Sequence, residues 1–212
     1  MESLLNRETV KRVQRALNVF NKNIYIQIQD KSAGTAIEAA NSLSCEVGAI
    51  VKSLILKSDN SFLLCLISGD KRCSLKKVKK LIEQKKVYMA NADDVKNITG
   101  FTIGGVSPIG HLTKVNILID NNLARFEDIF AAAGHPNCIF KINFNDLIKT
   151  VENKYLDSDL SDDKSLSDIQ NRFKCILIDE FQDTDNIQWN LIKKFFNDKK
   201  HFLLWQSYQL LN

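Results

Sequence analysis

The sequence lacks any long uninterrupted apolar stretch. No run in its 212 residues approaches the roughly 18 to 20 apolar residues that a transmembrane helix needs, so we expect no membrane span. The first seven residues, Met1–Arg7, also lack the basic and then apolar order of a secretory signal peptide. These absences favour a cytoplasmic protein.

Cysteine is present but has no metal-binding order. The five cysteines are scattered and show no C-x-x-C spacing, which argues against both a zinc site and a disulfide framework. Reduced thiols in a cytoplasm fit this pattern best. We therefore predict neither a metal nor a cofactor. The overall composition, 44% hydrophobic and 25% charged, is that of an ordinary globular chain with a core.

Positive charge is unevenly distributed along the chain. Residues 1–155 contain 22 Lys and Arg against 15 Asp and Glu, a net charge of +7, whereas residues 156–212 contain 7 against 10, a net charge of −3. The basic excess is concentrated between Lys71 and Lys86. Such a density suits a phosphate backbone, and a solvated lysine face explains it equally well.

Apolar periodicity predicts both helices and strands. Helices are predicted over residues 8–20, 36–44, 75–82, 92–98, 126–133 and 143–151. Strands are predicted over residues 24–28, 49–56, 61–68, 87–90, 115–119 and 138–142. Because these elements do not alternate regularly, we predict an α+β fold, with a mixed, largely antiparallel sheet, surrounding helices and a short C-terminal α/β fragment.

Glycine and proline are scarce, with eight and two residues, yet four glycines and one proline fall within Thr99–His111. Gly104 and Gly105 let the backbone approach a ligand closely, and Pro108 fixes the far side of the turn. Such a loop can hold N–H donors near a phosphate or near a carbonyl oxygen that becomes negative during a reaction. A plain turn between two elements explains the same residues.

Lys52 interrupts the apolar run of the predicted strand 49–56. An ammonium group there must reach solvent, a partner or a ligand. A lysine that extends along the strand to solvent is the alternative interpretation.

Residues 8–152 resemble the YbaK/prolyl-tRNA synthetase-associated domain family. The resemblance rests on several short segments in the family's order. These are Ala36–Ala40, Ile50–Leu54, Ser68–Asp70, Thr99–Gly100, Gly104–Gly110, Ile119–Asp120 and Ala132–Asn137. The family includes free-standing proteins, and an insertion domain of bacterial prolyl-tRNA synthetases, that hydrolyse wrongly aminoacylated tRNA.

The resemblance implies hydrolysis in trans of the ester bond of mischarged aminoacyl-tRNA, with tRNA-Pro carrying a small non-cognate amino acid as the expected substrate. It implies the acceptor end of tRNA as a partner and prolyl-tRNA synthetase as a candidate partner. The implied catalytic residues are Lys52, Gly104, Gly105, Val106 and Ser107. The implied substrate-binding residues are Lys52, Gly100, Pro108, Asp120, His135 and Pro136.

This assignment suits the chemistry of the residues. An aminoacyl ester is already activated, so a site that orients it and stabilises an oxyanion can hydrolyse it without a strong nucleophile. Two of the residues also have structural explanations: Asp120 can cap the turn after its strand, and His135 can make one structural hydrogen bond. A non-catalytic module that binds a tRNA end or a nucleotide is the alternative function.

The last quarter of the chain differs from the rest. We predict an editing domain over residues 1–155, an acidic linker over 156–170 and a truncated helicase-like fragment over 171–212. Ile176–Asp185 resembles the Walker B segment of UvrD/RecB-type helicases, with Asp179 and Glu180 as a vestigial magnesium-binding pair. The sequence has no Gly-x-x-x-x-Gly-Lys-[Ser/Thr] loop, so we expect no functional ATP binding and disfavour a DNA helicase or nuclease.

Overall fold

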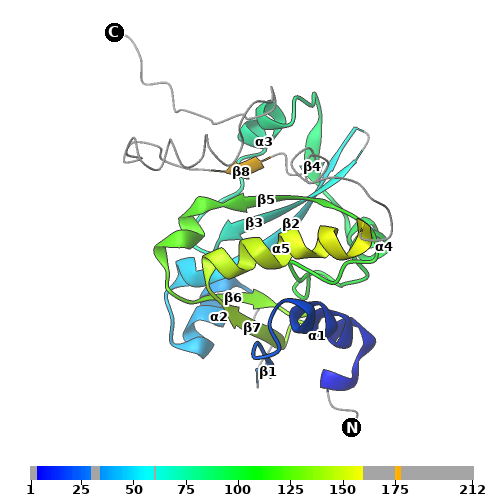
Figure 1. Ribbon diagram of the computed structural model, residues 1–212. Helices are drawn as coiled ribbons and strands as arrows, with labels where there is room; N and C mark the ends of the chain where they lie inside the picture. Colours follow the sequence, from blue (N-terminus) through cyan, green and yellow to red (C-terminus); the bar gives the residue numbers. More distant parts are fainter. Residues whose placement is uncertain (1–3, 30–33, 60, 160–174, 178–212) are drawn as a thin grey trace, which may run out of the picture.

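A computed structural model describes residues 4–29, 34–59, 61–159 and 175–177 of the chain. These residues fold around one eight-stranded sheet (Figure 1). The strand order is β1-β7-β6-β2-β3-β5-β8, and β4 also pairs with β2. The β1–β7, β6–β7, β2–β3 and β2–β4 pairs are antiparallel. The β2–β6, β3–β5 and β5–β8 pairs are parallel. The predicted fold class is confirmed.

The elements have the following bounds. The strands are β1 (Ile26–Ile28), β2 (Ile50–Ser58), β3 (Phe62–Ser68), β4 (Val87–Met89), β5 (Asn116–Asp120), β6 (Ile129–Ala132), β7 (Cys138–Ile142) and β8 (Cys175–Leu177). The α-helices are α1 (Glu8–Phe20), α2 (Ala36–Leu43), α3 (Leu75–Leu81), α4 (Ala92–Thr99) and α5 (Phe144–Asp159). Short 3-10 helices are η1 (Leu4–Asn6), η2 (Val47–Ala49) and η3 (Asn121–Arg125).

The central strands are buried on both faces, because alternate side chains enter two different cores. In β3, Leu64 and Leu66 pack into the larger core with α1, α4 and α5. Leu63, Cys65 and Ile67 pack into a smaller core under α3. This two-sided burial explains why the β3 sequence is a continuous apolar run rather than an alternating one. Figure 1 shows α5 crossing one face of the sheet, with α3 at the end of the molecule away from α1.

Side-chain caps start α2 and α4 at or next to the predicted helix starts. The Thr35 hydroxyl accepts the Glu38 N–H at 3.2 Å, and the Glu38 carboxylate accepts the Gly34 N–H at 2.7 Å. Asn91 accepts the Asp94 N–H at 2.8 Å and caps α4 in the same way. Each cap satisfies backbone donors that the first turn of a helix leaves without partners.

The helix predicted over residues 126–133 is wrong. Residues 129–132 form strand β6, which lies between β7 and β2 in the sheet. Ile129 and Ala131 are buried in the larger core, whereas Phe130 and Ala132 are only half-buried, which is the two-residue period of a strand. Pairing on both sides outweighs the helical preference of the alanines, since strand formation depends strongly on context.

A glutamine side chain covers part of the outer edge of β1, the first strand of the sheet. The Gln14 carboxamide of α1 accepts the Ile26 N–H at 3.2 Å and donates to the Ile24 carbonyl at 2.9 Å. The amide therefore makes the two kinds of hydrogen bond that a neighbouring strand would make.

The C-terminal part of the described chain joins the same sheet. Helix α5 continues to Asp159, and residues 156–159 of the segment predicted as a linker are therefore helical. Cys175–Leu177 pairs in parallel with Leu118–Asp120 of β5. No helix within the described ranges is long and apolar enough to cross a membrane.

Candidate active site

A cavity of about 500 Å³ opens between α2, the first half of β2, the end of β6 and the glycine loop. Of the predicted site residues, Lys52, Gly104, Val106 and Pro136 line it. Most of the remaining wall is apolar. The wall includes Ala36, Ile37 and Leu43 of α2, Leu54 of β2, Ile103 of the loop, Phe130 and Ala132 of β6, and Ile139 of β7.

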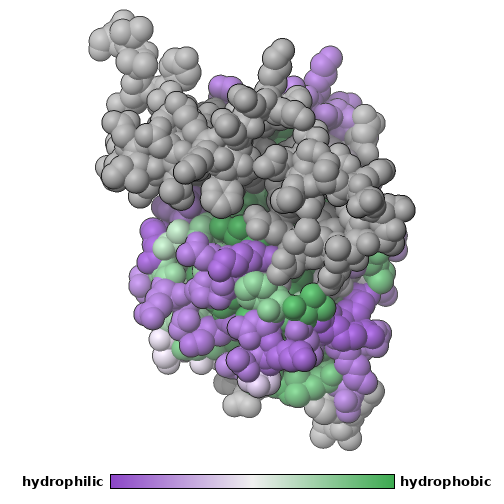
Figure 2. All heavy atoms as spheres, viewed as in Figure 1, coloured by the Kyte–Doolittle hydropathy of each residue, from purple (hydrophilic) through white to green (hydrophobic). Residues whose placement is uncertain are grey.

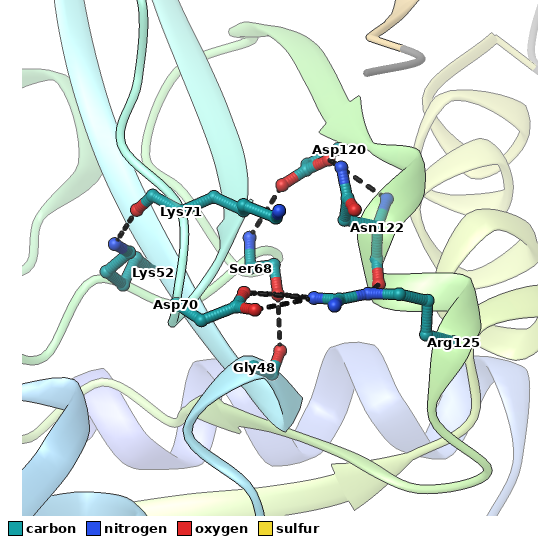
Figure 3. Close-up of polar contacts among 8 residues, drawn as sticks. All are labelled: Gly48, Lys52, Ser68, Asp70, Lys71, Asp120, Asn122 and Arg125. Carbon is teal, nitrogen blue, oxygen red and sulfur yellow. Dashed lines mark hydrogen bonds and ion pairs between the residues drawn. The ribbon is translucent and has the colours of Figure 1, made fainter. Parts of the chain in front are cut away.

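Lys52 is the only lysine or arginine among the described residues that line this cavity. Strand β2 holds it opposite Ile67 of β3, and its side chain is half-buried. Its Nζ donates to the backbone carbonyl of Lys71, as Figure 3 shows. Burial lowers the pKa of Lys52, and the carboxylates of Asp70 and Asp120 partly oppose that shift.

The glycine loop packs directly on the turn that carries His135. The Gly134 N–H donates to the Gly105 carbonyl at 3.0 Å, and a Cβ added to Gly105 would lie 2.9 Å from the His135 Cα. Only glycine permits this close approach. The Gly105 N–H donates to the Thr102 carbonyl at 2.9 Å, so it is not free to bind a ligand.

The N–H groups of Gly104, Val106 and Ser107 have no hydrogen-bond acceptor among the described residues. Gly104 and Val106 belong to the cavity wall. Ser107 is fully buried beside it, and its hydroxyl accepts the Ile109 N–H at 3.4 Å. The loop therefore offers two to three backbone donors at one end of the cavity.

Gly100 and Pro108 shape the loop rather than the cavity wall. Gly100 ends α4 with a φ of 74°, and its N–H donates to the Lys96 carbonyl at 2.8 Å. Pro108 is buried. Both are absent from the cavity lining.

Asp120 lies outside the cavity lining and bonds to Ser68, the last residue of β3, and to Asn122 (Figure 3). The residue is 5% exposed, and its carboxylate accepts the Ser68 N–H at 3.0 Å. It also accepts the Asn122 N–H at 2.9 Å and the Asn122 side-chain amide at 3.0 Å. These contacts agree with the alternative interpretation, in which Asp120 caps the turn after its strand.

Arg125 completes this group and was not singled out by the sequence. Its guanidinium contacts both carboxylate oxygens of Asp70, at 3.0 and 2.9 Å, and donates to the Ser68 hydroxyl at 3.2 Å. The Ser68 hydroxyl also lies 2.6 Å from the Gly48 carbonyl. These contacts fix the turn after β3, whose Gly69 lines the cavity and whose Lys71 carbonyl holds Lys52.

His135 lies in the turn between β6 and β7 and is half-buried. Its Nδ1 accepts the Asn137 N–H at 3.1 Å, which requires an unprotonated Nδ1. Burial lowers the pKa of His135, and the positive charge of Arg7 lowers it further. Pro136, the next residue, extends the turn into the cavity wall.

We expect His135 to titrate below its usual value of 6.5. The folded chain then binds fewer protons than the unfolded chain, so the stabilisation from neutral His135 is complete above pH 6.5 and is lost as the pH falls through the folded-state pKa. NMR titration of the imidazole protons measures the midpoint. An Arg7→Ala variant is the control and should raise the midpoint, whereas a wild-type midpoint at or above 6.5 would contradict the assignment.

Helix α2 forms part of the cavity wall, although none of its residues is among the predicted site residues. Thr35, which caps α2, also lines the cavity together with the first turn of that helix. The signal was present in Ala36–Ala40, one of the segments that carry the family resemblance. In the described part of the chain, no three His, Cys, Asp or Glu residues gather as metal ligands. Asp179 and Glu180 lie outside the described residues.

Comparison with known proteins identifies relatives of the editing region. A proline–tRNA ligase of Caldicellulosiruptor saccharolyticus is 27% identical over 68% of this chain, which spans only 23% of the ligase. The uncharacterised Bacillus subtilis protein YwhH is 26% identical over 66% of this chain and 88% of its own length. The crystal structure of a candidate trans-editing enzyme for prolyl-tRNA synthetase is 33% identical with a TM-score of 0.65, covering 68% of this chain and 92% of that one.

The aminoacyl-tRNA editing domain model matches residues 30–150, which include Lys52, the glycine loop and the His135 turn. The match ends before the segment that resembles a helicase and gives that resemblance no support. The matched region is more than half of the chain and contains the whole cavity wall. This chain therefore belongs to the aminoacyl-tRNA editing domain family.

Proposed function

We propose that this protein hydrolyses, in trans, the ester bond of mischarged tRNA, with tRNA-Pro carrying a small non-cognate amino acid as its substrate. The observation that carries the proposal is the meeting of a half-buried cation, Lys52, with the open backbone donors of Gly104 and Val106 at one cavity. The membership of an editing family and the similarity to proline–tRNA ligases support this choice of substrate class.

The two groups of donors have different tasks in this mechanism. The N–H groups of Gly104, Val106 and Ser107 stabilise the oxyanion that forms when water adds to the ester carbonyl. The Lys52 ammonium binds the terminal adenosine or its phosphate and holds the ester in place. The bond between the carbonyl carbon and the ribose oxygen then breaks, and a proton of the attacking water passes to that oxygen. The products are the free amino acid and uncharged tRNA. Gly105 contributes through its close packing, because its own N–H is already bonded to Thr102.

The cavity wall supports a small uncharged amino acid. Ile37, Phe130 and Ile139 present apolar surface, against which a charged side chain would lose hydration without gaining a partner. Discrimination between similar small side chains rests on about 1–3 kcal/mol per group. Because charged tRNA is the substrate, we propose a cytoplasmic location and the tRNA acceptor end as the binding partner. Docking on prolyl-tRNA synthetase is a further part of the proposal.

A panel of tRNA-Pro charged with Ala, Cys, Ser or Pro tests this function. We expect the full chain to release at least one of the three non-cognate amino acids faster than proline, because proline must survive for translation. Release of radiolabelled amino acid, corrected for spontaneous hydrolysis, is the measurement. A folded protein that binds the tRNA end but releases none of the four would contradict hydrolysis and indicate the non-catalytic binding module.

A further inference from the structure

The surface formed by the basic residues between Lys71 and Lys86, called here the α3 surface, is distinct from the cavity. Eight of the sixteen residues from Lys71 to Lys86 are Lys or Arg, and Glu83 is the only acidic residue among them. Helix α3 starts at a Ser74 cap and buries Val78 and Leu81 in the smaller core. Because these two residues face the core, the lysines of the helix lie on its outer side, where Lys76 and Lys80 are exposed.

Four of the eight basic residues of the α3 surface form no ion pair within the described part of the chain. Arg72, Lys76, Lys85 and Lys86 are exposed, and they form no ion pair with the described residues. Lysines elsewhere are often paired, as Lys141 is with Asp128 at 2.8 Å. An unpaired cluster of one sign produces a local positive potential that attracts polyanions.

The α3 surface is joined directly to the candidate active site. Gly69 lines the cavity, and the carbonyl of Lys71, at the start of the surface, accepts the hydrogen bond of Lys52 Nζ. The chain then runs from Lys71 into α3 within four residues. A polyanion whose end enters the cavity therefore meets the positive charge of this surface next to the cavity.

We propose that the α3 surface binds the phosphate backbone of the tRNA acceptor stem while the aminoacylated end occupies the cavity. This inference rests on the proposed function for the choice of RNA. Lysine ammonium groups contact phosphates as point charges and carry no base specificity. The surface thus supplies affinity and orientation, and the cavity supplies selection of the amino acid.

The test compares two triple variants with the same change in net charge. Lys76→Gln, Lys85→Gln and Lys86→Gln together neutralise part of the α3 surface. The matched control, Lys11→Gln, Lys22→Gln and Lys96→Gln, removes three exposed lysines on or next to α1 and α4. Binding of uncharged tRNA-Pro is measured by fluorescence anisotropy between 50 and 200 mM KCl, so that the readout does not depend on hydrolysis.

We expect the α3 variant to bind uncharged tRNA at least about tenfold more weakly at low salt, and the slope of log K against log salt to fall by about 2 to 3. The control should stay within about twofold of wild type, because a general charge effect alone is small. Equal affinities and slopes for the two variants would overturn the proposal. Hydrolysis of a short aminoacyl-CCA ester should be unchanged in the α3 variant, because that substrate has no acceptor stem. If the proposed activity is wrong, the wild-type protein does not hydrolyse this ester either, whereas tRNA binding still tests the α3 surface.

Discussion

Replacement of Lys52 with alanine is expected to lower kcat/KM for ester hydrolysis by about 10²-fold, because the ester loses the contact that positions it against the backbone donors. Lys52 is the cavity's cation, and its carbonyl partner on Lys71 holds the ammonium in place before substrate arrives. Alanine removes both the charge and that restraint. Initial rates on the non-cognate aminoacyl-tRNA identified by the panel measure the effect.

Lys57→Ala is the matched control for this experiment. Lys57 lies on the same strand, but its Nζ pairs with Asp94 at 3.0 Å and it is not part of the cavity lining. We expect hydrolysis by Lys57→Ala to stay close to wild type. Equal rates for Lys52→Ala and wild type would remove Lys52 from the mechanism. Equal losses in both variants would show that the effect comes from the strand and not from the site.

Asp120→Ala should destabilise the protein by about 2–4 kcal/mol, because it leaves buried donors without an acceptor. The buried Ser68 N–H and two half-buried Asn122 donors all bond to the carboxylate of Asp120, a residue that is 5% exposed. Alanine restores none of these bonds, whereas Asp120→Asn keeps an acceptor oxygen and should cost less. Urea unfolding followed by circular dichroism gives the free energy of unfolding of each variant.

Asp128→Ala provides the comparison for a surface carboxylate. Its side chain is 45% exposed, and it pairs only with Lys141 among the described residues, so its removal should shift the urea midpoint little. If the Asp120→Ala protein keeps wild-type stability but loses hydrolysis, Asp120 binds substrate rather than organising the backbone. Lost stability together with hydrolysis that persists under folding conditions would establish the backbone-organising role.

Much of the fold could be predicted because local signals were strong. The α1 bounds follow from the apolar stripe of Val10, Val13 and Leu17, all of which are buried. The β2–β3 hairpin follows from two apolar runs separated by a polar turn, and helix caps such as Asn91 mark the start of an element. In each of these cases the residues that decide the structure are close together in the sequence.

Features that depend on distant residues could not be predicted in the same way. Strand β6 lies between β7, which follows it after a short turn, and β2, whose Ile50 pairs with Phe130 from 80 positions earlier in the chain. The pairing of Arg125 with Asp70 joins residues 55 positions apart. The hydrogen bond from the Gly105 N–H to the Thr102 carbonyl depends on the path of the loop backbone, which the residue composition does not specify. The Gly105 N–H is therefore not among the donors that we propose for the oxyanion.

The Gln14 amide at β1 also bears on how copies of the protein can meet. Exposed strand edges readily recruit further strands, and they are a common route to aggregation. Here a new strand would first have to displace two existing hydrogen bonds, those to Ile26 and Ile24. An asparagine at this position would be one methylene shorter than glutamine, so the reach of the side chain is part of the protection. One helical residue thereby discourages edge-to-edge polymerisation on this side of the sheet.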